Sequence, residues 1–309
     1  MSAPRLALKV DVDTYSGTVG GIPRLLELFA KHGVAATFFF SLGPDNTGKA
    51  IKRVLRKGFV KKVLRASPGA SYGIRTMLSG TLLPARDIGA SAEAVARMRE
   101  AKAAGHECGI HAWDHVDWHD RAATMARAEI EEIVDRSHAR FEAIFGEPAA
   151  LSAAPGWTAT PLTVEVEAAH GIRVSSNTRG GAPFHALRPD GKPAATLEVP
   201  STLPTLDELL ALDEFGAGEA ARERTVAHLA EAARTGGPHV HSIHTEIEGG
   251  RALGPLFARQ LAAWKDAGVV FVTLGALAAE RLVDPEPVPA RPLAWTTLPG
   301  RAIRVATQG

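Results

Sequence analysis

The feature that most constrains the fold is a regular alternation of short β-rich runs with helical patterns along most of the 309 residues. Such an alternation predicts a parallel α/β fold rather than a β-sandwich or a helix bundle. The candidate strands are residues 5–12, 35–42, 106–110, 149–154, 172–176, 195–200, 238–244 and 269–274. The candidate helices are residues 22–32, 91–104, 123–145, 161–170, 217–235 and 254–267.

Two regions interrupt the alternation. Residues 44–90 are too long for a loop between a strand and a helix of a compact domain, so we expect a functional insertion or a subdomain there. Residues 284–309 contain five prolines in 26 positions, which makes a packed element unexpected. The sequence therefore predicts one domain over residues 1–283, with an insertion after its second strand, followed by a proline-rich tail.

Charge is distributed unevenly, although the formal net charge is only +1. Residues 44–86 hold ten basic side chains and one acid, Asp45, for a local charge of +9. The rest of the chain carries 25 basic and 33 acidic side chains, a net charge of −8. A near-zero total would argue against an anionic partner only if the charges were evenly spread.

The single cysteine, Cys108, cannot form an internal disulfide, so the sequence does not require an oxidising compartment. Charged residues appear at Lys9 and Asp11, before an apolar signal-peptide core can form, and no apolar run reaches about 18 residues. We therefore expect a cytoplasmic protein without a membrane span.

Two polar clusters follow candidate strands in the first half of the chain. Asp11 and Asp13 end the first strand, and His111 and His115 follow the third. Histidines four residues apart share one face of a helical turn, and two of them with one aspartate can form an open three-ligand metal site. Each pair alone also has a plain explanation, since a carboxylate often caps a turn and HxxxH arises by chance.

Further clusters end later strands, at Pro155-Gly156-Trp157, at Asn177 and Arg179, and at His244 and Glu246. All of these groups lie at the carboxyl ends of predicted parallel strands, which is where α/β barrels and open α/β sheets place their active sites. Polar residues that only form hydrogen bonds with other buried groups in the core would not collect at one end of the sheet. His239 and His241 alternate away from His244, so we expect them to be structural.

The order of these clusters resembles the polysaccharide deacetylase family, the nodulation-type carbohydrate esterases of family four. Within it, several segments resemble the 4-deoxy-4-formamido-L-arabinose-phosphoundecaprenol deformylases, namely VDVDTYSG at 10–17, FFSLGPDNTG at 39–48, GIHAWDHVDWH at 109–119, SAAPGW at 152–157 and IHTEIEG at 243–249. The resemblance covers roughly residues 5 to 280. It implies a distorted (β/α) barrel and a hydrolase that cleaves a linear amide C–N bond.

The resemblance also implies the roles of individual residues. Asp13, His111 and His115 would hold one divalent metal ion, which these ligands would accept as zinc, cobalt or manganese. Asp11 would be the general base and His244 the general acid. Substrate would contact the loops that carry Pro155, Gly156, Trp157, Asn177, Arg179 and Glu246.

Two positions depart from the broader family. Ala153 stands where its third motif usually has an arginine, and Asn177 stands where its fourth motif has an acid. Both departures bear on how Asp11 is oriented. Arg179 is the candidate that would either supply the missing cation or bind a substrate phosphate through its several donors.

The basic insertion contains an amphipathic pattern over residues 49–65, with eight cations, no acid and one apolar stripe. This pattern is typical of a helix that lies in a membrane interface, and also of a solvated helix on the barrel or a nucleic-acid patch. A polyprenyl-phosphate substrate, which the resemblance implies, favours the membrane. The predicted interface residues are Lys52, Arg53, Arg56, Lys57, Lys61 and Lys62.

The sequence thus predicts a metal-dependent deformylase that acts on a polyprenyl-phosphate-linked formamido-arabinose. It would work at the cytoplasmic face of the bacterial inner membrane, in lipid A modification and polymyxin resistance. We expect an anionic membrane surface as partner, no nucleic acid, and no evident protein partner. Two alternatives stay open, a soluble sugar N-deacetylase with the same catalytic residues and a non-catalytic lipid- or glycan-binding homologue.

Overall fold

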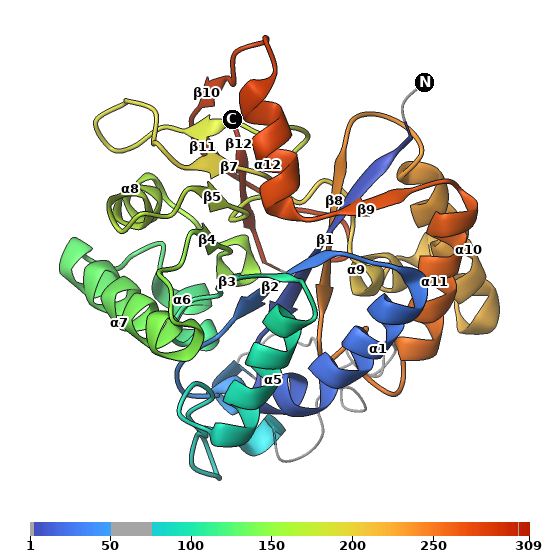
Figure 1. Cartoon of the computed structure of the whole chain (residues 1–309), viewed down its shortest axis with the longest axis horizontal. Helices are drawn as coiled ribbons and strands as arrows, with labels where there is room; N and C mark the ends of the chain where they lie inside the picture. Colours follow the sequence, from blue (N-terminus) through green and yellow to red (C-terminus); the bar gives the residue numbers. More distant parts are fainter. Residues whose placement is uncertain (1–2, 51–75, 302) are drawn as a thin grey trace.

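The computed structural model describes residues 3–50, 76–301 and 303–309. Its centre is a curled sheet of parallel strands in the order β7-β5-β4-β3-β2-β1-β8, with β9 also paired to β1 (Figure 1). The strands are β1 (Arg5–Val12), β2 (Ala36–Phe40), β3 (Glu107–Ile110), β4 (Leu151–Ser152), β5 (Val174–Ser175), β7 (Leu197–Glu198), β8 (His239–His244) and β9 (Val270–Val272). Each lies within a run that the sequence predicts to be a strand.

The two ends of the curled sheet approach each other. The backbone N–H groups of Thr202 and Leu203, which follow β7, both donate to the carbonyl of Val240 in β8, at 3.0 and 3.1 Å. The predicted distorted (β/α) barrel is therefore confirmed, in the form of a curled parallel half-barrel whose edges are joined by a few hydrogen bonds.

Helices surround the outside of the sheet (Figure 1). Sequence signals explain where they begin and end: Pro23 lies in the first turn of α1, Gly33 ends it in the left-handed conformation, and the Ser91 hydroxyl accepts the N–H of Ala94 at the start of α5. The longer helices are α1 (Ile22–His32), α5 (Ala92–Ala103), α7 (Arg127–Phe145), α8 (Pro161–Ala169), α10 (Gly218–Ala232), α11 (Gly254–Asp266) and α12 (Leu274–Val283).

The central strand β1 has two different faces because successive side chains point in opposite directions. Leu6, Leu8 and Val10 belong to the main apolar cluster beneath the helices, where edge-to-face aromatic pairs such as Phe29 with Phe38 add to the packing. Alternation directs Lys9, Asp11 and Asp13 to the inside of the half-barrel. The inside of the half-barrel therefore receives charged side chains from a strand that is buried over Leu6–Val12.

Two expectations about secondary structure are corrected. The helix predicted over 123–145 begins at Arg127, and a separate short helix, α6 (His115–Arg121), precedes it. Helix α12 directly follows β9, and α9 (Leu206–Leu210) lies in the connection between β7 and α10; neither was expected. Their apolar residues merge with those of the adjoining strand or loop, so the change of period is not visible in the sequence.

The prediction that the proline-rich tail lacks packed elements is wrong. Strand β11 (Leu293–Thr296) pairs antiparallel with β12 (Val305–Gln308), and the carbonyl of Ala306 accepts the backbone N–H of Arg179 at 2.9 Å. The five prolines lie before β11 or in the turn that follows it, so none removes a donor from the hairpin. Nearby, β10 (Ala290–Arg291) pairs with β6 (His185–Ala186), which the sequence did not predict.

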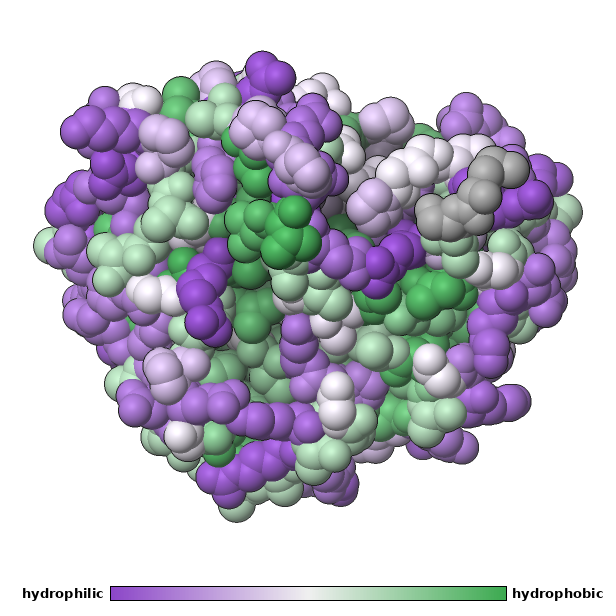
Figure 2. Space-filling view, turned by 45° about the horizontal axis from the view of Figure 1, so that its top comes forward, coloured by the Kyte–Doolittle hydropathy of each residue, from purple (hydrophilic) through white to green (hydrophobic). Residues whose placement is uncertain are grey.

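The six cations predicted to contact a membrane all fall between residues 51 and 75, outside the described residues. Within the described part of the chain, no helix combines the length and the apolar character that a membrane crossing requires. The face seen in Figure 2 is mainly hydrophilic, with separate apolar patches among the polar side chains.

Candidate active site

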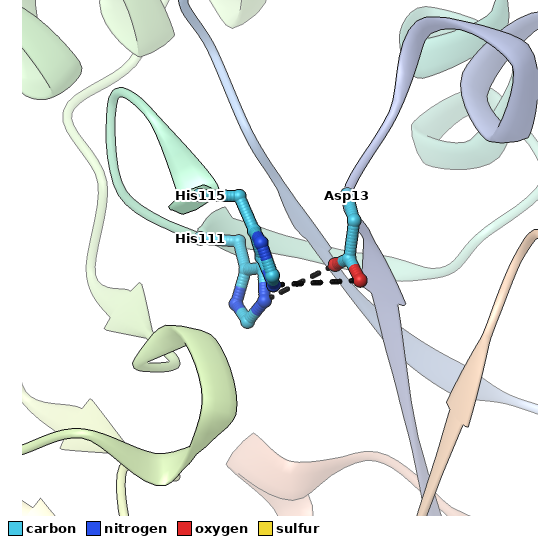
Figure 3. Close-up of side chains that lie close together, drawn as sticks. All are labelled: Asp13, His111 and His115. Atoms are coloured by element: carbon cyan, nitrogen blue, oxygen red, sulfur yellow. Dashed lines mark ion pairs between the residues drawn. The ribbon is translucent and has the colours of Figure 1, made fainter. Parts of the chain in front are cut away.

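Asp13, His111 and His115 converge at the carboxyl end of the sheet (Figure 3). The Nε2 atom of His111 lies 3.3 Å from Asp13 Oδ1, and Nε2 of His115 lies 3.5 Å from Asp13 Oδ2. One ligand atom from each residue falls within 4.8 Å of the other two. Two imidazoles and one carboxylate form a donor set that suits a divalent transition metal, and they leave coordination positions open.

The two histidines do not share a helical turn, which corrects the sequence-based expectation. His111 follows β3 in an extended segment, whereas His115 is the first residue of α6. Between them the chain turns sharply, because Ala112 adopts a left-handed φ of 64° and Asp114 caps α6 by accepting the N–H groups of Val116 and Asp117. The HxxxH spacing brings the rings together through a turn, not through helical periodicity.

Hydrogen bonds prepare the three residues to bind a cation. His111 Nδ1 lies 2.7 Å from the carbonyl of Ala153, which can only accept, so Nδ1 carries the proton and Nε2 presents its lone pair toward Asp13. Asp13 Oδ1 is buried without a hydrogen-bond partner among the described residues. A buried, unpartnered carboxylate oxygen beside two imidazole nitrogens fits a metal site in its residues and in their arrangement.

The local electrostatics favour a negatively charged Asp13. Burial alone would raise the pKa of its carboxyl, but His115, His111 and His244 together hold that pKa well below the usual range. Burial lowers the pKa of His115 against the opposing effect of Asp13. An ionised aspartate and neutral imidazoles are the protonation states that metal binding requires.

His244 and Asp11 lie beside this cluster on neighbouring strands, where they are register partners in the β1–β8 pair. Burial acts to lower the pKa of His244, but the carboxylates of Asp13, Asp207 and Asp11 and of its neighbour Glu248 outweigh it and raise the pKa to about 9. The imidazole is therefore protonated at neutral pH, as a proton donor must be.

Two further buried carboxyls border the site. Glu246 accepts the N–H and the hydroxyl of Thr14 at 2.9 and 2.5 Å, and burial together with Asp13 raises its pKa to about 8. Glu248 accepts the N–H of His244 at 2.7 Å, and burial raises its pKa to about 7. The sequence suggested that Glu246 and Glu248 either recognise the sugar or its amine or form a solvated charge pair, and only Glu246 was predicted as a substrate residue; both carboxyls are buried.

Lys9 is the residue of this region that the sequence analysis missed. Its side chain is 0% exposed, and its Nζ lies 3.4 Å from Asp11 Oδ2 and donates to the carbonyl of Ser176 at 3.0 Å. A signal was present in the sequence, since Lys9, Asp11 and Asp13 occupy alternate positions of one strand. A lysine at an inward position of a buried strand needs a partner, and the carboxylates two and four residues later are in reach.

Arg179 is not the cation beside Asp11, which corrects one of the two roles predicted for it. Its Nε donates to Ser201 O, its Nη1 pairs with Glu208 at 2.9 Å, and its Nη2 donates to Leu203 O, so its donor groups are engaged within the protein. The cation beside Asp11 is Lys9, as the buried ion pair shows.

Trp157 is also built into the core, at 2% exposure. Arg179 and Arg301 lie over its ring at 4.8 and 4.6 Å from the centroid, and Lys9 lies at 5.0 Å. A sugar that stacked on this indole would have to displace one of these cations. Its loop neighbour Gly156 adopts φ 59°, and a Cβ there would meet His119 Cδ2 at 2.0 Å, so only glycine fits.

Asn177 and Pro155 are buried like Trp157. The Asn177 amide donates to Glu167 at 2.7 Å, and its backbone N–H donates to Glu198, also at 2.7 Å. Of the predicted site residues, the structure thus brings together Asp11, Asp13, His111, His115, His244 and Glu246. It gives Arg179, Trp157 and Asn177 contacts within the protein.

The fold and the site define a hydrolase class: a curled parallel half-barrel with an Asp-His-His cluster flanked by a carboxylate and a protonated histidine. Residues 3–175 match the Polysaccharide deacetylase family model, which is more than half of the chain. The chain belongs to the polysaccharide deacetylase family. It is a hydrolase of the deacetylase and deformylase kind, which cleaves amide bonds.

Individual relatives agree with this family. A protein of Shewanella sediminis (strain HAW-EB3), described as a probable 4-deoxy-4-formamido-L-arabinose-phosphoundecaprenol deformylase ArnD, is 35% identical over 273 residues, which cover 87% of this chain and 84% of that protein. A protein of the same description from Wigglesworthia glossinidia brevipalpis is 32% identical and covers 63% of this chain and 67% of its own length.

Solved structures show the same fold at low sequence identity. The chitin deacetylase of the fungal pathogen Colletotrichum lindemuthianum superposes with a TM-score of 0.53 at 15% identity, covering 89% of this chain and 88% of that one. The Xyl-CE4 domain of a multidomain xylanase from the hindgut metagenome of Trinervitermes trinervoides superposes with a TM-score of 0.52 at 13% identity, covering 93% and 95%.

Proposed function

We propose that this protein is a metal-dependent deformylase that hydrolyses the formamide of 4-deoxy-4-formamido-L-arabinose-phosphoundecaprenol to the 4-amino sugar lipid and formate. This reaction would serve lipid A modification and polymyxin resistance. The observation that carries the proposal is the convergence of Asp13, His111 and His115 beside Asp11 and His244, in a chain 35% identical to a protein described as such a deformylase.

Asp13, His111 and His115 would hold one divalent ion, zinc, cobalt or manganese. When bound, such an ion polarises a carbonyl and lowers the pKa of water toward neutrality. Ala153 O keeps the His111 ring in the tautomer that leaves Nε2 free, and Asp114 keeps His115 at the start of α6. These contacts fix the ligands before any ion arrives, which reduces the ordering cost of binding.

The proton transfers would be divided between Asp11 and His244. As water attacks the formyl carbon, Asp11 would take the proton that the water loses. As the C–N bond breaks, His244 would give its proton to the sugar nitrogen, so that the amine leaves neutral rather than as an anion. The pKa of about 9 keeps His244 charged for this step at neutral pH.

The ends of the basic insertion support a membrane-facing site. Thr76 and Ser16 share a hydrogen bond of 2.8 Å, and Asn46 donates to Asp114, between the two histidine ligands, at 2.5 Å. Leu82, in the same returning segment, is 80% exposed. An insertion anchored beside the site, with its cations and an exposed leucine, would bring the site to an anionic inner-membrane surface where the lipid headgroup lies.

The first test is formate release from the formamido-arabinose polyprenyl phosphate. We expect Asp11→Asn, His115→Ala and His244→Ala each to lower the rate by about 10²-fold or more, as loss of a positioned acid, base or ligand does. The control is Asp135→Asn, which alters an exposed surface pair with His170 and should leave the rate unchanged. Chelation should abolish the activity and a divalent ion should restore it. Full activity in all three site variants would refute the assignment.

The alternative function is a soluble sugar N-deacetylase, which the match to the Polysaccharide deacetylase model favours. Acetylated water-soluble sugars, assayed beside the lipid, separate the two. Turnover of soluble sugars with none of the lipid would establish the deacetylase. Binding of the lipid with neither reaction and with no bound metal would instead indicate a non-catalytic homologue. Liposome binding that is unchanged when Lys52, Arg53, Arg56, Lys57, Lys61 and Lys62 are replaced by Gln would remove the membrane role of the insertion.

A further inference from the structure

Lys9 is a charged side chain enclosed in the interior of the half-barrel. It is 0% exposed on a strand whose neighbouring residues Leu8 and Val10 are also fully buried. Removing an ammonium from water costs several kcal/mol unless its partners compensate for the lost hydration. A methionine or leucine would fill a similar volume without that cost. A lysine at this place therefore needs a reason other than packing.

Three groups surround the Lys9 ammonium, as many as it has N–H donors. Asp11 Oδ2 lies at 3.4 Å, the carbonyl of Ser176 accepts at 3.0 Å, and the ring centroid of Trp157 lies at 5.0 Å. Trp157 is itself immobilised, because its Nε1 donates to Ser201 Oγ at 3.0 Å and two guanidinium groups cover its ring. The position of the Lys9 nitrogen is thus fixed from three directions.

The two oxygens of Asp11 have different surroundings. Oδ2 faces Lys9, whereas Oδ1 is buried with no hydrogen-bond partner among the described residues, 3.9 Å from His111 Nδ1. Across the described ranges, Lys9 is the one lysine or arginine with a nitrogen within 4 Å of this carboxylate. Its neighbours Arg179 and Arg301 both pair with Glu208 instead.

We propose that Lys9 is the positioning residue for Asp11: its ammonium holds Oδ2, so that Oδ1 is the oxygen presented to the reacting water. This inference rests on the proposed role of Asp11 as general base. The contacts of Lys9 are with Asp11, Ser176 and Trp157 and not with the three candidate metal ligands, so Lys9 acts through Asp11. The buried charge is then retained for orientation, because a carboxylate free to rotate would present the correct oxygen only part of the time.

The test compares Lys9→Met, Lys9→Gln and Lys9→Arg in the full-length, metal-loaded protein. We expect both uncharged variants to lose about 10²-fold in kcat, the scale of a misplaced general base, with KM changed by less than about twofold and metal content unchanged. Lys9→Arg, which restores a cation, should recover at least about tenfold of that loss. If Lys9→Met does not fold, Lys9→Gln serves alone, since it keeps a donor for Ser176 O.

A matched control is Lys102→Met. Lys102 also pairs with a carboxylate, Glu147 at 2.6 Å, and lies over an aromatic ring, Phe145 at 5.6 Å, but it is 37% exposed and far from the site in the fold. This variant should keep the wild-type kcat. Wild-type kcat in Lys9→Gln or Lys9→Met would overturn the proposal, as would a Lys9→Arg variant no more active than Lys9→Gln.

The Asp11→Asn background separates positioning from general support of the fold. If Lys9 acts through Asp11, then Lys9→Gln should lower the residual kcat of Asp11→Asn by less than about twofold. A further loss near 10²-fold there would overturn the proposal. Thermal unfolding needs no substrate: Lys9→Gln should lower Tm more in the wild type than in Asp11→Asn. This Tm difference reports on the Lys9–Asp11 ion pair even if the lipid is not the substrate. It therefore distinguishes a failure of the positioning role of Lys9 from a failure of the proposed function.

Discussion

Two buried polar networks lie within the half-barrel and differ in how completely they are satisfied. Around Arg179 and Glu208, guanidinium donors meet carboxylate and carbonyl oxygens, and Glu198 accepts from Ser175, Asn177 and Thr178. At the site, by contrast, Asp11 Oδ1, Asp13 Oδ1, His244 Nδ1 and Glu248 Oε1 are buried without partners among the described residues. We call the first the satisfied network because its charged groups are paired, although Asn177 Oδ1 and Arg301 Nε lack partners among the described residues. The second, unsatisfied network has carboxylate and imidazole atoms left for an ion, a water and a substrate.

The largest effect is expected from Asp13→Asn, a substitution at the centre of the unsatisfied network. Asp13→Asn removes the negative charge that faces His111 and His115, so metal content should fall from one ion per chain to nearly none. Formate release should fall by at least about 10³-fold, because metal loss removes several catalytic contributions together. Elemental analysis and the formate assay measure the two effects. Stoichiometric metal in the variant would show that another donor set binds it.

The second effect breaks the satisfied network. Arg179→Ala leaves the buried Glu208 with the N–H of Thr205 at 2.9 Å and, as its remaining cationic partner among the described residues, Arg301 at 3.2 Å. It also removes one of the cations that lie over Trp157. Loss of one partner of a buried pair costs about 3–5 kcal/mol, and we expect the lower end because Arg301 remains. Urea unfolding measures this loss. The kcat of the folded protein should stay within about threefold of wild type, since no Arg179 donor reaches the site. A loss of kcat with an unchanged free energy of unfolding would indicate that Arg179 contacts the substrate, as the sequence predicted.

The contrast between these networks also explains how far the sequence could be read. Strand positions were predictable because β1, β2 and β8 carry long β-rich runs, and the ligands were predictable because they directly follow such strands. The pairing of Lys9 with Asp11 was signalled by their alternate positions in one strand. The contacts of Lys9 with Ser176 and Trp157 were not predictable, because these residues come from segments more than 140 residues away. Similarly, the contacts of Arg179 depend on Glu208 and on the tail. Local sequence patterns do not indicate which distant side chain forms the last hydrogen bond of such a network.

The smallest expected effect concerns Glu167, a buried carboxyl of the structural kind that accepts from Asn177 at 2.7 Å. Burial raises its pKa to about 7 from the ordinary 4.5. The folded state therefore holds a proton that the unfolded state releases between about pH 4.5 and 7, so this group's stabilising contribution is present below that range and is lost as pH rises through it.

Glu167→Gln removes this titration while keeping an oxygen for Asn177. We compare the free energy of unfolding of the variant with that of the wild type at each pH. The variant's value minus the wild-type value should increase between pH 5 and pH 8 by at most about 3 kcal/mol, since each pKa unit corresponds to about 1.4 kcal/mol. Thermal unfolding at the two pH values measures it, with Glu165→Gln, a partly exposed glutamate of the same helix, as control. A stability difference independent of pH would mean that Glu167 is ionised in the fold. The Asn177 amide would then have to balance a buried carboxylate that has no cation paired with it among the described residues.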